Sequence, residues 1–157
     1  MTRSFEYPDV FYRLAEAVFK KNPNIKYQWS LNEKKQLREL IFPKSHEHGF
    51  EVGVCCQTYG IYPWISNLWW GPCWDINTPK TTFEEMSLEV LGLLRILLSP
   101  ESRVRIEQRG EKPSRFFLEF LTPMGWRVYA KNRINFFALF GEKKEIVYQN
   151  NVFFSDC

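Results

Sequence analysis

The histidines of the chain, His46 and His48, are two residues apart in one polar loop. In an extended backbone, side chains at this spacing project to the same side, which would let both bind one metal ion. A zinc site needs at least a third ligand, which would have to come from elsewhere in the chain. The alternative is a solvated turn that ends at Gly49. We therefore expect no metal site.

Signatures of the common catalytic and nucleotide-binding sites are missing from the sequence. There is no G-x-S-x-G nucleophile elbow, no G-x-x-x-x-G-K-[ST] phosphate loop and no G-x-G-x-x-G dinucleotide fingerprint. No cysteine lies near a histidine in the sequence, as activation of a thiol nucleophile would favour. The neighbouring carboxylates of Glu84 and Glu85 fit the start of a helix, where negative charge is favourable. We therefore expect a protein that is not an enzyme and that needs no cofactor.

Aromatic residues crowd a short segment that also contains Pro63, Gly71 and Pro72. They are Tyr59, Tyr62, Trp64, Trp69, Trp70 and Trp74. Because tryptophan and tyrosine dominate interface hot spots, the segment could offer anchors to a protein partner or stacking faces to a small ligand. The alternative is a loop that buries its rings in the core, and both can hold at once. We predict as binding residues Tyr62, Trp64, Trp69, Trp70 and Trp74.

Three C-terminal segments, 103–109, 115–121 and 126–131, alternate apolar and polar residues as half-buried strands do. The predicted inward set is Val104, Ile106, Phe116, Leu118, Phe120, Trp126, Val128 and Ala130. The predicted outward set is Arg103, Arg105, Glu107, Arg109, Arg115, Phe117, Glu119, Arg127, Tyr129 and Lys131. This basic face could bind phosphates or an acidic protein, or its glutamates could offset the arginines on a solvated surface. We predict as binding residues Arg103, Arg105, Arg115 and Arg127.

Two apolar stripes predict the helices that would support these segments. The first comprises Val10, Phe11, Leu14, Ala15, Val18 and Phe19. The second follows a T-x-x-E capping box at Thr82 and Glu85 and comprises Phe83, Met86, Val90, Leu93, Leu94 and Leu97. Leu88, Leu91 and Leu98 widen this second stripe, so we expect its helix to be the main core element. Gly92 would allow close backbone approach there.

Strand signals fill much of the remaining chain. Segment 25–31 alternates polar and apolar residues, and 32–42 fits either a short helix or a hairpin with its turn at 32–35, of which we favour the hairpin. Segments 50–57 and 61–66 would complete a four-stranded meander, while 142–154 fits a short helix followed by a strand. We predict one globular α+β domain over residues 1–157. In it, the N-terminal helix and the central apolar helix pack on one face of a largely antiparallel β-sheet.

The composition predicts a soluble, cytoplasmic protein. The net charge of +3 is far from the one-sided balance of a dedicated nucleic-acid binder. The cysteines show no C-x-x-C pair, so we expect free thiols in a reducing compartment; they are Cys55, Cys56, Cys73 and Cys157. The longest apolar run, 88–98, is too short to span a bilayer, and the polar N-terminus does not fit a signal peptide.

These observations favour a non-enzymatic protein-binding or adaptor domain that holds a protein partner or a second copy of itself. The alternative is a small-molecule-binding domain or an enzyme, with the aromatic residues 59–74 lining its pocket. Nucleic-acid binding would require a continuous arginine face whose cations are not already paired. We therefore expect neither nucleic acid nor a membrane as the partner.

Overall fold

The computed structural model of the protein describes residues 6–32, 34, 37–57, 60–71, 74–75, 82–135 and 140–155. For residues 6–8, 70, 74 and 75 it describes the backbone alone. The chain divides into two compact units. Unit 1 comprises Met1–Pro43, Glu51–Arg95 and Phe153–Cys157, and unit 2 comprises Lys44–Phe50 and Ile96–Val152.

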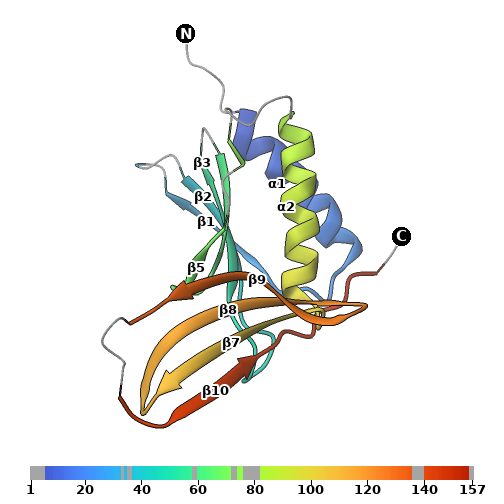
Figure 1. The fold of residues 1–157 in the computed structure, drawn as a ribbon. Coiled ribbons are helices and arrows are strands. Elements are labelled where there is room, and N and C mark those ends of the chain that lie inside the picture. Colours follow the sequence, from blue (N-terminus) through green and yellow to red (C-terminus); the bar gives the residue numbers. More distant parts are fainter. Residues whose placement is uncertain are drawn as a thin grey trace. The chain divides into compact units, whose positions relative to one another are not determined.

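Unit 1 consists of a six-stranded antiparallel sheet with the two helices on one side of it (Figure 1). Its strands are β1 (Gln28–Asn32), β2 (Leu37–Phe42), β3 (Val52–Gln57), β4 (Gly60–Ile65), β5 (Trp69–Trp70) and β6 (Trp74–Asp75). Strands β1 to β5 are neighbours in chain order, and β6 pairs with β4. The helices are α1 (Glu6–Lys21) and α2 (Phe83–Leu98).

Helix α1 buries Phe11, Ala15 and Phe19 against this sheet. The Phe11 ring meets the Trp29 ring of β1 edge-on, with 6.2 Å between the centroids. The Phe19 ring meets the Phe42 ring of β2 in the same way at 5.5 Å. The predicted apolar stripe of the first helix therefore faces the core of unit 1.

Strands β3 and β4 pack unusually tightly where Gly53 pairs with Trp64. A Cβ atom on Gly53 would lie only 2.1 Å from the Trp64 ring, so the ring rests directly on the glycine backbone. Pro63 sits inside β4, where a missing N–H would normally disrupt a ladder. The Pro63 carbonyl accepts a hydrogen bond from Gly71 N (2.8 Å). The N and C=O groups of one strand residue point to the same side, so the N–H that Pro63 lacks would also have pointed to this side of β4. This side faces the gap between β5 and β6, where no ladder bond is lost.

Helix α2 begins at the predicted capping box. Thr82 N donates to Glu85 Oε2 (2.9 Å), and Glu85 N donates to Thr82 Oγ1 (3.2 Å). One stripe of the helix is buried, while Leu88 on the opposite side is exposed. The expected close approach at Gly92 is wrong, because none of the described atoms outside the helix lies within 4 Å of a Cβ built there.

Unit 2 contains a second antiparallel sheet, in the order β10-β7-β8-β9 (Figure 1). Its strands are β7 (Ser102–Arg109), β8 (Lys112–Thr122), β9 (Gly125–Arg133) and β10 (Lys143–Tyr148). Both predicted turns are present. Gly110 and Gly125 take positive φ angles of 59° and 95° there, which favour glycine over residues with a Cβ.

Buried Asn150 fastens the loop 44–50 to the chain beyond β10, within unit 2. Its Oδ1 accepts a hydrogen bond from Phe50 N (3.1 Å), and its Nδ2 donates to Phe50 O (3.0 Å) and to Leu97 O (3.3 Å). His48 O accepts a further bond from Gln149 N (2.8 Å). The loop that contains the histidines is therefore held through its backbone by the Asn150 side chain and the Gln149 N–H.

The predicted α+β class is confirmed, and so is the hairpin over the uncertain segment 32–42, as β1 and β2. Two differences stand out. The strands form two sheets where we expected one, and the predicted helix at the start of 142–154 is wrong because β10 occupies this position. None of the described helices is long and apolar enough to cross a membrane. That residues 1–157 form a single domain stays a prediction.

Candidate functional site

The pairing of β7 with β8 places Arg103, Arg105 and Arg115 on one face of the unit 2 sheet, which we call the arginine face. Directly opposite residues of an antiparallel pair share a face, and the pairs here are Arg103 with Glu119, Arg105 with Phe117, and Glu107 with Arg115. The other face carries Val104, Phe116 and Leu118, which are buried as predicted.

A buried carboxylate organises the centre of the arginine face. Arg103 Nε donates to Glu119 Oε2 (2.6 Å), and Arg105 Nε donates to Glu119 Oε1 (3.0 Å). Burial favours the neutral form of Glu119, but the hydrogen bonds and charges of Arg105 and Arg103 outweigh it, so its pKa lies below the ordinary 4.5. The Arg105 Nη1 atom also lies 3.5 Å from Glu107 Oε1 and 3.2 Å from Glu145 Oε1. These two arginines are thus already neutralised within unit 2.

Aromatic rings hold the same two guanidinium groups from another side. The Arg103 guanidinium lies over the Trp126 ring at 4.2 Å from its centroid, and that of Arg105 lies over the Phe117 ring at 4.1 Å. Cation–π contact and ion pairing together fix both side chains. Their geometry indicates a structural role for Arg103 and Arg105.

A bulge in β9 reverses the predicted alternation of that strand. Ala130 pairs with Leu118, but the next pair joins Val128 to Glu119, so Tyr129 is the extra residue. Trp126 and Val128 therefore lie on the arginine face, although the alternation predicts both on the inner side. The predicted place of Arg127 on the arginine face is wrong, because it pairs with Phe120 on the opposite face. Tyr129 also turns to that side and stacks on Phe120 at 4.4 Å.

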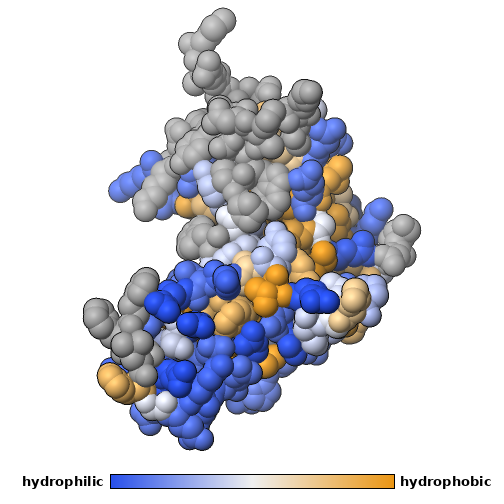
Figure 2. Space-filling view, in the orientation of Figure 1, coloured by the Kyte–Doolittle hydropathy of each residue, from blue (hydrophilic) through white to orange (hydrophobic). Residues whose placement is uncertain are grey.

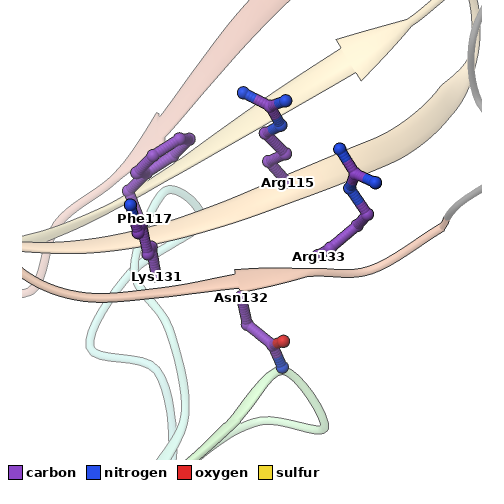
Figure 3. A pocket seen from close by; sticks show the side chains of 5 residues that line it. All are labelled: Arg115, Phe117, Lys131, Asn132 and Arg133. Atoms are coloured by element: carbon purple, nitrogen blue, oxygen red, sulfur yellow. The ribbon is translucent and has the colours of Figure 1, made fainter.

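An open pocket of about 400 Å³ lies at the other end of β8 and β9. Its lining residues are Arg115, Phe117, Lys131, Asn132 and Arg133. Figure 3 shows Arg115, Lys131, Arg133 and Phe117 projecting to one side of the strands, while the Asn132 side chain points away. Within the described part of the chain, no acidic group lies within 4 Å of the charged atoms of Arg115 or Lys131.

The hairpin that joins β8 and β9 carries exposed apolar side chains, which we call the apolar end of the arginine face: Leu121, Met124 and Val128. Their exposed fractions are 50%, 81% and 50%, respectively. Leu121 pairs with Trp126 across the strands, and Thr122 Oγ1 accepts a bond from Met124 N (3.2 Å), which fixes the turn. Figure 2 shows hydrophobic side chains scattered among hydrophilic ones over the strands of unit 2.

The aromatic segment of unit 1 contributes to the core. Trp64 and Trp69 are only 7% and 9% exposed, and Tyr62 is half-buried. Trp70 and Trp74 lie in the short strands β5 and β6, and their side chains fall outside what the structure describes, as does the whole of Tyr59. The rings that can be placed thus support the buried alternative.

The thiols and histidines that the structure describes form no cluster of metal ligands. Cys55 and Cys56 are buried free thiols, and burial raises the pKa of both; Cys73 and Cys157 lie outside the described residues. His46 Nδ1 accepts a bond from His48 N (3.2 Å) within the loop. Across the described ranges, no three His, Cys, Asp or Glu side chains are grouped to hold a metal ion.

Sequence reasoning missed the basic residue Arg133 and the exposed apolar end. Lys131 was among the predicted outward residues, and continuing the alternation by two positions would have added Arg133. The exposure of Val128 carried no such signal, because the bulge at Tyr129 decides which face it joins. Comparison of the chain with protein-family models, with curated proteins and with solved structures found no match in any of the three.

Proposed function

We propose that this chain is a non-enzymatic protein-binding domain and that the arginine face of unit 2 is its binding surface. The observation that carries the proposal is the apolar end, where Leu121, Met124 and Val128 are exposed beside Trp126. Large apolar side chains gathered on one exposed surface are typical of interaction sites. A partner would remove them from water.

The residue types around the apolar end support a protein partner. Interface centres are enriched in Trp, Phe, Met and Arg, and hot spots in Trp and Arg. Trp126 and Arg103 are stacked beside the apolar end, and the Glu119 ion pair fixes Arg103. Side chains that are already ordered lose little entropy when a partner binds, which favours affinity.

The charge of unit 2 favours an acidic partner. Unit 2 contains 11 basic and 7 acidic residues, whereas unit 1 contains 10 basic and 11 acidic residues. Complementary charge raises association rates and selects among partners. We therefore expect the partner to present an apolar anchor flanked by Asp or Glu. The aromatic segment 59–74 has less support as the binding surface, because Trp64 and Trp69 are buried.

Selection from a displayed library of random peptides tests this proposal. Peptides enriched on the wild-type protein should combine large apolar residues with Asp or Glu. Val128→Glu places a charge in the apolar end and should weaken their binding at least tenfold, because truncation or disruption of a hot spot removes about 2 kcal/mol or more. Light scattering of the purified wild type and of Val128→Glu would show whether the protein self-associates and whether this surface is needed for it.

Arg127→Glu provides the matched control, since Arg127 lies on the same strand but on the opposite face. It makes a larger change in net charge than Val128→Glu and should leave binding of the selected peptides nearly unchanged. Enrichment of peptides without acidic residues, or equal binding to both variants, would contradict the proposal.

A further inference from the structure

The pocket beside Phe117 brings together cations from two neighbouring strands, β8 and β9. Arg115 on β8 pairs directly with Arg133 on β9, and Phe117 pairs directly with Lys131. Like charges directly opposite each other destabilise a strand pair. Glu107 lies opposite Arg115 on β7, but its carboxylate contacts Arg105 (3.5 Å) and Lys143 (3.2 Å).

We infer that this pocket binds the phosphoryl group of a phosphate monoester, held by Arg115, Lys131 and Arg133. An anion placed between the strands would lie against cations from both β8 and β9. Arg115 and Lys131 are exposed, and no acidic group of the described residues lies within 4 Å of their charged atoms. Both can therefore turn to a ligand without breaking an ion pair. The inference goes beyond the proposed function, since it concerns a site away from the apolar end.

The number of cations favours a phosphoryl group over a carboxylate. Arg115 and Lys131 line the pocket with no acidic group of the described residues within 4 Å, and a carboxylate would neutralise only one of these two charges. A phosphate monoester carries about −1.5 to −2 charges near pH 7 and offers three acceptor oxygens. The planar guanidinium groups of Arg115 and Arg133 can each bind two of these oxygens.

The size and aromatic wall of the pocket favour a monoester over inorganic phosphate. Its volume of about 400 Å³ lies in the usual range of small-molecule sites, about 300–1,000 Å³. The Arg105 guanidinium over the Phe117 ring keeps that wall in place. An organic group attached to the phosphate could therefore contact Phe117 while the phosphoryl oxygens face the cations.

Isothermal titration with phenyl phosphate tests the inference directly. Arg115→Gln and Lys131→Gln should each weaken binding about tenfold or more, since a hydrogen bond between charged groups contributes about 1.5–3 kcal/mol. Benzoate has the same ring and one charge, so it should bind about tenfold more weakly than phenyl phosphate. Affinity should also fall between about pH 7.5 and pH 5, as the second phosphate proton binds with a pKa near 6.

Arg127→Gln, on the opposite face, should leave the affinity for phenyl phosphate unchanged. The source of the phosphoryl group is distinguished by comparing phenyl phosphate with a peptide that carries phosphotyrosine and with its unphosphorylated form. A phosphopeptide that binds much more tightly than phenyl phosphate would identify a modified partner protein. Equal affinities would indicate a small metabolite.

The inference is overturned if phenyl phosphate does not bind, if benzoate binds equally well, or if the two pocket variants behave like Arg127→Gln. Tighter, salt-dependent binding of a single-stranded oligonucleotide would overturn it in favour of a nucleic-acid surface. Val128→Glu separates this inference from the proposed function, because it should weaken peptide binding at least tenfold and leave phenyl phosphate binding intact. Two independent pocket variants keep the test valid if one of them does not fold.

Discussion

Replacing Glu119 by glutamine measures how much the buried ion pair stabilises the unit 2 sheet. Removing one partner of a fully buried pair typically costs about 3–5 kcal/mol, because the other charge is left buried. Here the arginines are partly exposed, and Arg105 keeps contacts with Glu107 and Glu145. We therefore expect Glu119→Gln to lower the free energy of unfolding by about 2 kcal/mol near neutral pH.

The pH dependence of this difference follows from the lowered pKa of Glu119. Its pKa in the folded protein lies below the ordinary 4.5 expected for the unfolded chain. The stabilisation is then fully present above about pH 4.5 and is lost as the pH falls through the folded-state pKa. Urea unfolding of the wild type and of Glu119→Gln, from about pH 7 downward, should show the two stabilities converge in acid.

Glu145→Gln is the matched control for this experiment. Glu145 also contacts Arg105, at 3.2 Å, but its side chain is 47% exposed. An exposed ion pair contributes about 0–1 kcal/mol, so the control should change stability little at any pH. A loss in Glu119→Gln that is no larger than in Glu145→Gln, or that does not vary with pH, would refute the assigned role of the carboxylate.

Four further predictions concern the core, the glycines, the thiols and metal, and the number of domains. Leu94→Ala should lower stability by about 2–5 kcal/mol in urea unfolding, because Leu94 is buried, and Leu88→Ala on the exposed side should change it by less than about half a kcal/mol. Gly53→Ala should destabilise the protein by about 1–3 kcal/mol or more, because the new Cβ would overlap the Trp64 ring. Gly92→Ala should stabilise helix α2 by about 0.5–1 kcal/mol, since a Cβ has room there. Calorimetry of both variants would show the opposite signs. Reductant and chelator should leave the melting temperature unchanged, and a marked drop with either would reveal a disulfide or a metal. Circular dichroism and tryptophan fluorescence should report coincident unfolding transitions if the chain is one domain, and separate transitions would show two.

Local patterns in the sequence were sufficient for most elements. The T-x-x-E box fixed the start of α2 because its two hydrogen bonds join residues three apart. The inward set Val104, Phe116 and Leu118 is buried because alternation along a strand follows from the backbone alone. Turns at Gly110 and Gly125 were likewise readable, since few residues other than glycine adopt positive φ.

Contacts between residues far apart in the sequence decided the rest. The chain could not reveal that β10 pairs with β7, since pairing over such a distance depends on the packing of the whole sheet. The bulge at Tyr129 has no sequence signature. It nevertheless puts Trp126 and Val128 on the arginine face and moves Arg127 to the opposite face. A net charge of +3 is the same whether arginines are paired or not. Cross-strand register brings Glu119 beside Arg105 and places Arg133 opposite Arg115, because it sets which charges lie within a few ångströms of one another.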